Sequence, residues 1–97
     1  MAASAFKIHI PTPLRQFVAG DEAVQVPGTT VSDALANLAE RHPGLRKHLY
    51  DDQGRLRAFV NVYVNDEDIR YLEARENTPL REGDSISIVP SIAGGRR

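Results

Sequence analysis

The feature that most constrains the fold is a strict alternation of residue types between positions 59 and 65. Valine stands at positions 60, 62 and 64, and larger or polar residues stand between them. Because successive side chains of a β-strand point to opposite faces of a sheet, the valines share one face while Phe59 and Tyr63 share the other. The segment therefore predicts a strand whose valine face packs on a core.

Three further segments have the pattern of strands. Residues 6–10 alternate apolar with polar side chains and stop at a proline-rich turn, and residues 23–26 form a shorter run that stops at Pro27. A long connection joins these two runs, so together they predict a hairpin. Residues 85–89 alternate again before Pro90, whose missing N–H ends regular pairing.

One amphipathic helix is predicted between the second of these strands and the valine strand. Thr30 has the position of an N-cap, and Asp33 follows it at the spacing of a capping box. Pro43 ends the helix, and residues 45–50 predict one further turn. The helix carries a single apolar stripe, formed by Val31, Ala34, Leu35, Leu38 and Ala39.

The order of a hairpin, one helix and two main strands predicts an α+β fold of the β-grasp type. We expect a mixed sheet in which the first and last strands lie side by side and parallel, with one main helix packed on one face. The domain spans residues 1–90, and residues 91–97 form a flexible tail. The connections are a loop at 51–54, turns at 65–68 and 81–84, a short return strand from Ile69 to Tyr71, and an irregular stretch at 73–80.

The composition argues against several classes of protein. The chain has 97 residues, enough for one domain with a single core. Its net charge is -1 and no segment concentrates lysine or arginine, so we expect no nucleic-acid binding. It has no cysteine, which excludes disulfides and thiolate chemistry. No apolar run approaches the roughly 20 residues that cross a bilayer, and no signal-peptide pattern begins the chain. We therefore expect a cytoplasmic protein without membrane contact.

Side chains that catalyse reactions or bind metals are not grouped in the sequence. His9, His42 and His48 share no ligand spacing, and the acidic run 66–68 is typical of a solvated turn rather than of a cation site. No serine lies in a nucleophile elbow, and no glycine-rich phosphate loop is present. We therefore expect a non-catalytic protein that binds no metal and no cofactor.

Phe59 and Tyr63 form a candidate docking surface. They stand on the face of their strand opposite the valines, where an exposed apolar patch would meet a partner. A helix turn or a loop of the same chain would cover them equally well. Both interpretations stay open from the sequence.

The last residues combine small side chains with a diglycine. Glycine adds no apolar surface to a core, but Ala93, Gly94 and Gly95 suit a slot that bulkier side chains would block. In extended form, residues 91–95 reach roughly 16 Å beyond the fold, far enough to thread a partner's active site. A frayed terminus explains the same composition, so the threading interpretation depends on the domain before it.

Residues 59–68 read Phe-Val-Asn-Val-Tyr-Val-Asn-Asp-Glu-Asp, residues 80–90 read Leu-Arg-Glu-Gly-Asp-Ser-Ile-Ser-Ile-Val-Pro, and residues 93–95 read Ala-Gly-Gly. This succession of strand, Asn-Asp turn, Gly-Asp, strand, proline and diglycine resembles the MoaD/ThiS family of ubiquitin-like sulfur carriers. The resemblance extends over nearly the whole chain. Within the family, the sequence looks most like the carrier that feeds a PLP-dependent cysteine synthase.

The resemblance implies a function for Gly95. In this family the terminal glycine carboxylate is adenylated with ATP by an E1-like adenylating enzyme, and sulfur then replaces AMP to give a C-terminal thiocarboxylate. The carrier delivers that sulfur to a partner synthase, here in cysteine biosynthesis. ATP is used by the activating enzyme, and the carrier itself is expected to bind no cofactor.

The chain departs from the family pattern in that Arg96 and Arg97 follow Gly95. Some relatives carry such extensions, which a JAMM-type metalloprotease removes, and we expect the same trimming here. Other readings within the family are the small subunit of molybdopterin synthase, whose partner is the large subunit, and a carrier for thiamine or tRNA thiolation. Two hypotheses from other functional classes are a ubiquitin-like modifier that is joined to lysines and an inert binding module with the same fold.

Overall fold

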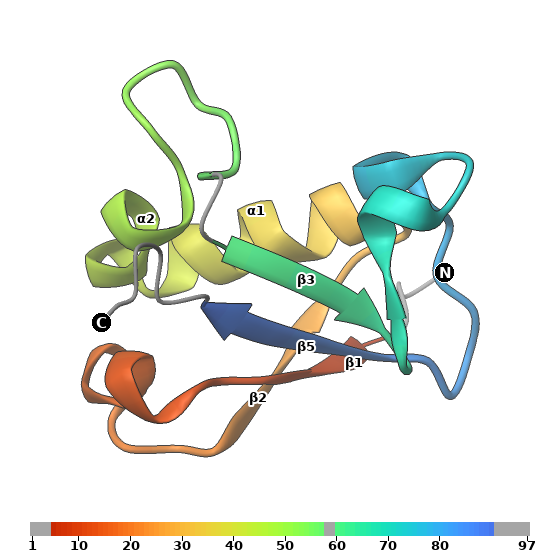
Figure 1. Cartoon of the computed structure of the whole chain (residues 1–97). Helices are drawn as coiled ribbons and strands as arrows, with labels where there is room; N and C mark the ends of the chain where they lie inside the picture. Colours follow the sequence, from red (N-terminus) through yellow and green to blue (C-terminus); the bar gives the residue numbers. More distant parts are fainter. Residues whose placement is uncertain (1–4, 58–59, 91–97) are drawn as a thin grey trace.

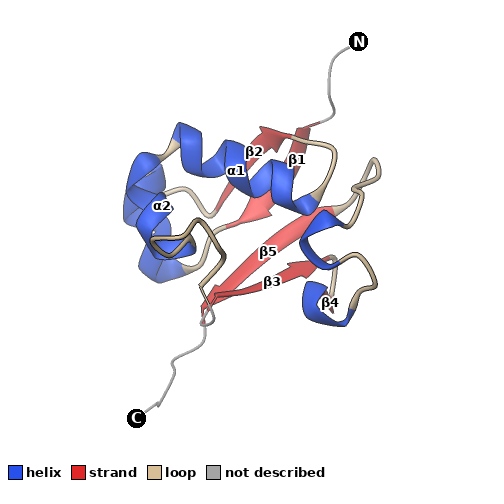
Figure 2. Ribbon diagram, turned by 90° about the horizontal axis from the view of Figure 1, so that it is seen from above, coloured by secondary structure: helices blue, strands red, loops and turns tan. Residues whose placement is uncertain are grey.

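The computed structural model describes residues 5–57 and 60–90, in which helices cover one face of a five-stranded sheet (Figure 1). Seen from above, α1 crosses the strands on that face (Figure 2). The elements in chain order are β1 (Ala5–His9), the 3₁₀ helix η1 (Thr12–Val18), β2 (Ala23–Pro27), α1 (Val31–Arg41), α2 (Pro43–Leu49), β3 (Val60–Val64), β4 (Glu67–Asp68), the 3₁₀ helices η2 (Ile69–Tyr71) and η3 (Arg75–Asn77), and β5 (Ser85–Pro90).

The strands lie in the order β2-β1-β5-β3-β4. The first and last strands are neighbours and run parallel, with Ile8 opposite Ile86, while the other pairs are antiparallel. The predicted α+β architecture of the β-grasp type, with a mixed sheet and the main helix on one face, is confirmed. β5 therefore lies in the middle of the sheet, paired on both sides.

The core lies between the helices and one face of the sheet. Val62 and Val64 are buried there, as the alternation predicted, and the apolar stripe of α1 is buried against them. Each large side chain that is fully buried contributes about 1.5–3 kcal/mol relative to an exposed one. The core cluster comprises Ile8, Ile10, Leu14, Val18, Val26, Val31, Ala34, Leu35, Leu38, Leu45, Leu49, Val62, Val64, Ile69, Ile86 and Ile88.

Two local features bring α1 close to the sheet. The helix begins where predicted, with the Asp33 N–H donating to the Thr30 hydroxyl at 3.1 Å. Just before it, the chain passes Gly28, where a Cβ atom would lie 2.9 Å from the Ala34 nitrogen. Real Cβ atoms do not approach backbone that closely, so only glycine allows this crossing.

Three expectations about the connections need correction. The segment from Ile69 to Tyr71 is a 3₁₀ helix and not a strand, because the Asp68 carboxylate accepts from the Arg70 N–H at 2.9 Å and turns the chain; the return strand is Glu67–Asp68. The expected turn at 45–50 is a full helix that begins at Pro43, a residue whose fixed φ suits the first helical position. The stretch 73–80 contains the helix η3.

The long connection of the predicted hairpin contains η1, which the sequence analysis did not predict. It lies at the end of the sheet and buries Leu14 and Val18 in the core. Within residues 5–57 and 60–90, no helix is both long and apolar enough to cross a membrane.

Candidate functional site

β5 places its end at one edge of the molecule. Pro90 lies opposite Val60, the first residue of β3, so β3 pairs with β5 as far as the last described residue, whereas the pairs between β5 and β1 end at Ser87. Figures 1 and 2 both show this end of β5 on the side of the molecule where α2 lies. Ala93, Gly94, Gly95, Arg96 and Arg97 fall outside the described residues, and their roles stay predictions.

The beginning of β5 is fixed by the Asn-Asp turn and the Gly-Asp pair of the sequence. Asn65, with φ of 58°, donates from its side-chain amide to Asp84 at 3.0 Å and accepts from the Ser85 N–H at 3.2 Å. Its own N–H donates to the Ser85 carbonyl at 2.8 Å. The Arg81 N–H and the Asn65 amide lower the pKa of the Asp84 carboxyl. These contacts fix where the strand that leads to the tail begins.

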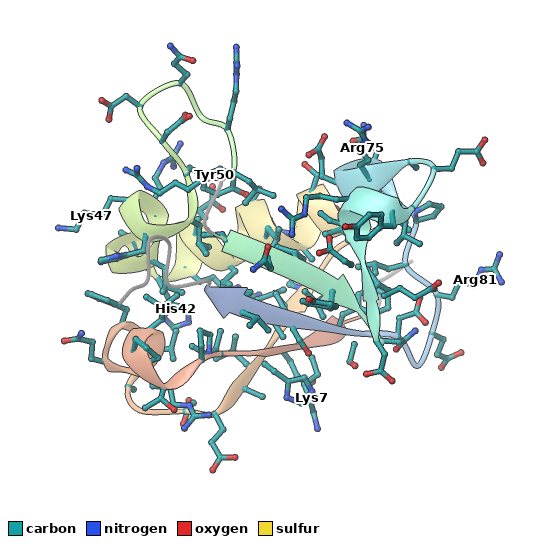
Figure 3. The ribbon with its side chains drawn as sticks, viewed as in Figure 1. Lys7, His42, Lys47, Tyr50, Arg75 and Arg81 are labelled. Carbon is teal, nitrogen blue, oxygen red and sulfur yellow. The ribbon has the colours of Figure 1, made fainter. Side chains whose placement is uncertain are left out.

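The face of the sheet opposite the helices is open. Lys7 and His9 are exposed on it, and Figure 3 shows Lys7 pointing away from the helices. Tyr63 is half-buried on this face, opposite Ser87 of β5. Phe59, its predicted companion, lies outside the described residues. The docking role of this pair therefore stays a prediction.

Arg70 joins β3 to β4 beside Tyr63. Its guanidinium contacts the Asp68 carboxylate at 2.9 Å and also donates to the Asn61 amide oxygen. The hydrogen bonds from the Arg70 guanidinium and the Arg70 N–H lower the pKa of Asp68. The Asp68 carboxylate therefore has Arg70 as its cationic partner. In the described part of the chain, no group of three or more His, Cys, Asp or Glu side chains is placed to hold a metal ion.

Sequence reasoning missed two exposed apolar residues and one charged surface. Val89 is 45% exposed on the open face. Its neighbours Ile86 and Ile88 point into the core, and side chains alternate along a strand, so residue 89 points the other way. Tyr71 is 87% exposed, and its position in η2 had no sequence signal. Basic residues of α2 and of the loop at 51–57 gather near the end of β5, an arrangement that depends on contacts between segments.

Comparisons with known proteins agree with this fold. The ThiS family model matches residues 8–95. The sulfur carrier protein CysO of Mycobacterium tuberculosis (strain ATCC 25618 / H37Rv) is 38% identical over 90 residues, which cover 91% of this chain and 96% of CysO.

Solved structures are similar over nearly their whole length. The crystal structure of the Amycolatopsis orientalis BexX/CysO complex contains a chain that matches with a TM-score of 0.82 and 36% identity, covering 94% of this chain and 100% of that one. SAMP1, the small archaeal modifier protein 1 of Haloferax volcanii, matches with a TM-score of 0.79 and 28% identity, covering 95% and 100%. Sequence, topology and these matches show that the chain belongs to the ThiS family of ubiquitin-like sulfur carriers, which are not themselves catalysts.

Proposed function

We propose that this protein carries sulfur as a thiocarboxylate on Gly95 and delivers it for cysteine biosynthesis. The observation that carries the proposal is the 38% identity to CysO over 91% of the chain. The position of β5 supports it, because this strand lies in the middle of the sheet and is paired with β3 as far as Pro90, just before the residues that would carry the sulfur.

The chemistry requires a free glycine carboxylate. One carboxylate oxygen attacks the α-phosphate of ATP, and pyrophosphate leaves. Sulfide then attacks the acyl carbon, AMP leaves, and the carbonyl carbon keeps one oxygen and gains one sulfur. If a persulfide is the donor, its outer sulfur attacks and AMP leaves, and a thiol then reduces the resulting acyl disulfide, which releases the thiocarboxylate and leaves a disulfide between that thiol and the donor. An E1-like adenylating enzyme holds ATP and catalyses the first step. A PLP-dependent cysteine synthase accepts the sulfur.

Arg96 and Arg97 must be removed before activation, because the Gly95 carboxyl forms a peptide bond with Arg96 and is not free to react. Hydrolysis of the Gly95–Arg96 bond by a JAMM-type metalloprotease would release it. Processing, activation and delivery are all reactions of the cytoplasm, where we place the protein.

The activation step tests this proposal directly. The chain ending at Gly95 and the chain ending at Arg97 are each incubated with the E1-like enzyme and ATP, and pyrophosphate release is measured. We expect release with the first chain only. Gly94→Val in the shorter chain should lower the rate on the order of 100-fold, because a misplaced carboxyl reacts slowly. Equal rates for all three chains would contradict the proposal.

A protein modifier is the second candidate, because SAMP1 shares the fold and is named a modifier. In that role Gly95 would form an isopeptide bond with a lysine of a target. Conjugates of higher mass that survive reducing denaturation in lysates of the native cells would favour this function. A thiocarboxylate without such conjugates would leave the carrier function alone.

A further inference from the structure

The expectation that no segment concentrates lysine or arginine is wrong for residues 41–57. Residues 41–57 contain five lysines and arginines and two aspartates, whereas residues 60–90 contain three arginines and seven carboxylates. Four of the basic residues, Arg46 and Lys47 of α2 and Arg55 and Arg57 of the following loop, are all exposed. We call these four residues the basic end. Figure 3 shows Lys47 and Arg81 at opposite ends of the molecule.

Specific hydrogen bonds hold the basic end together. The Arg57 guanidinium donates to the Lys47 carbonyl at 2.7 Å, and the Arg57 N–H donates to the Leu49 carbonyl at 2.8 Å. These bonds fasten the loop to the last turn of α2. Arg46, Lys47 and Arg57 consequently line one surface hollow of about 590 Å³. The backbone that carries the four cations, and the Arg57 side chain, are therefore held in place.

No side chain of the basic end forms an ion pair within the described residues. Over residues 5–57 and 60–90 the one ion pair is Arg70 with Asp68, on another part of the sheet. Asp51 and Asp52 line the same hollow, and the Asp51 carboxylate accepts from the Gln53 and Arg55 N–H groups at 2.8 and 3.0 Å. Those backbone bonds, with smaller contributions from Arg55 and Arg57, lower the pKa of Asp51. The aspartate shapes the loop, and the cations face solvent.

The basic end lies beside the strand that leads to the tail. The Val60 N–H donates to the Arg57 carbonyl at 3.0 Å, and Val60 is the residue paired with Pro90. An enzyme that receives the tail must therefore approach within reach of Arg57 and its neighbours on α2. Charged side chains at this position change the rate at which the two proteins associate.

We propose that the basic end docks on an acidic protein surface around the channel that receives the tail. Charge complementarity of this kind raises association rates and selects partners more than it adds affinity. The partner is a protein rather than a nucleic acid, because the chain has a net charge of -1 and two carboxylates, Asp51 and Asp52, line the same hollow and would repel a phosphate backbone. This inference rests on the proposed function and names the surface that its activating enzyme recognises.

The test is a pair of charge reversals in the chain ending at Gly95. Arg46→Glu with Lys47→Glu alters the basic end, and Arg75→Glu with Arg81→Glu makes the same change in net charge elsewhere. Neither pair of side chains makes a hydrogen bond or an ion pair within the described residues. Arg46→Gln with Lys47→Gln is added, because glutamate in the last turn of α2 opposes the helix dipole.

Two quantities are measured with the E1-like enzyme: the dissociation constant of the chain and the steady-state kinetics of pyrophosphate release. For the basic-end reversal we expect KM and Kd to rise about tenfold or more with kcat nearly unchanged, and their dependence on salt to flatten. The glutamine pair should give an intermediate rise, and the reversal at Arg75 and Arg81 should change KM less than twofold.

Equal effects of the two reversals, or no effect of either, would overturn the inference. Loss of binding to a single-stranded RNA in the basic-end variant, with activation unchanged, would assign the surface to nucleic acid and also overturn it. If the enzyme binds the unaltered chain through the basic end but releases no pyrophosphate, the proposed function fails while the docking surface stands.

Discussion

At the residue scale, the account depends on polar side chains that fix the beginning of β5. Asp84 accepts from the Arg81 N–H at 2.8 Å and from the Asn65 amide at 3.0 Å, and these bonds hold its pKa below the usual value. A carboxyl whose pKa is lower in the folded state stabilises the fold above its unfolded pKa, about 3.9 for aspartate. That stabilisation is lost as the pH falls through the folded pKa.

We therefore predict that Asp84→Asn unfolds at a lower urea concentration than the unaltered chain at pH 7, and that the difference shrinks below about pH 4. Asp66→Asn is the matched control, because the Asp66 side chain makes no hydrogen bond within the described residues. If the difference in the urea midpoint were the same at pH 7 and pH 3, the charge of Asp84 would not contribute to stability, and the prediction would be contradicted.

At the element scale, α1 contributes its buried stripe to the core, and two threonines at its start make different contacts with Asp33. The Thr30 hydroxyl accepts from the Asp33 N–H at 3.1 Å, while the neighbouring Thr29 hydroxyl makes a longer contact of 3.4 Å with the Asp33 carboxylate. We predict that Thr30→Ala lowers the free energy of unfolding by about 1 kcal/mol, as loss of an N-cap does. Thr29→Ala should cost less than half as much. Urea titrations of both variants check this, and equal losses would contradict it.

The sequence predicted the elements whose causes are local. Val60 to Val64 alternates and Thr30 caps a helix, so each of these is visible within a few residues. The 3₁₀ helix at Ile69–Tyr71 was missed because it depends on the burial of Ile69 and on the Asp68 side chain turning back to Arg70. The basic end was missed because the bond from Arg57 to the Lys47 carbonyl spans ten residues.

At the scale of the whole molecule, the domain and the tail have separate roles. Among the described residues, the core cluster runs from Ile8 to Ile88. We predict that a chain ending at Pro90 melts at the same temperature as the full chain, because changes outside a core usually alter stability by no more than about 0.5 kcal/mol. Calorimetry of both chains checks this. A clear fall in melting temperature would place part of the folded domain beyond Pro90.

The candidate site was predictable from the sequence only in part. The diglycine and the two arginines after it are visible in the sequence. Their roles stay predictions, because residues 91–97 lie outside the described part of the chain. The structure adds what surrounds the base of the tail: a central strand, an open sheet face with half-buried Tyr63, and the basic end. The parallel pairing of the first and last strands was predicted, whereas the basic end depends on a bond between residues ten positions apart, which alternation patterns do not reveal.

The central claim is that Gly95 carries sulfur in the cell. The most direct measurement is mass spectrometry of the intact protein purified from its native cells without reducing agents. We predict chains that end at Gly95, a fraction of which have one carboxyl oxygen replaced by sulfur, and we predict that this fraction disappears when the E1-like enzyme is deleted. Finding only chains that end at Arg97 would contradict the account.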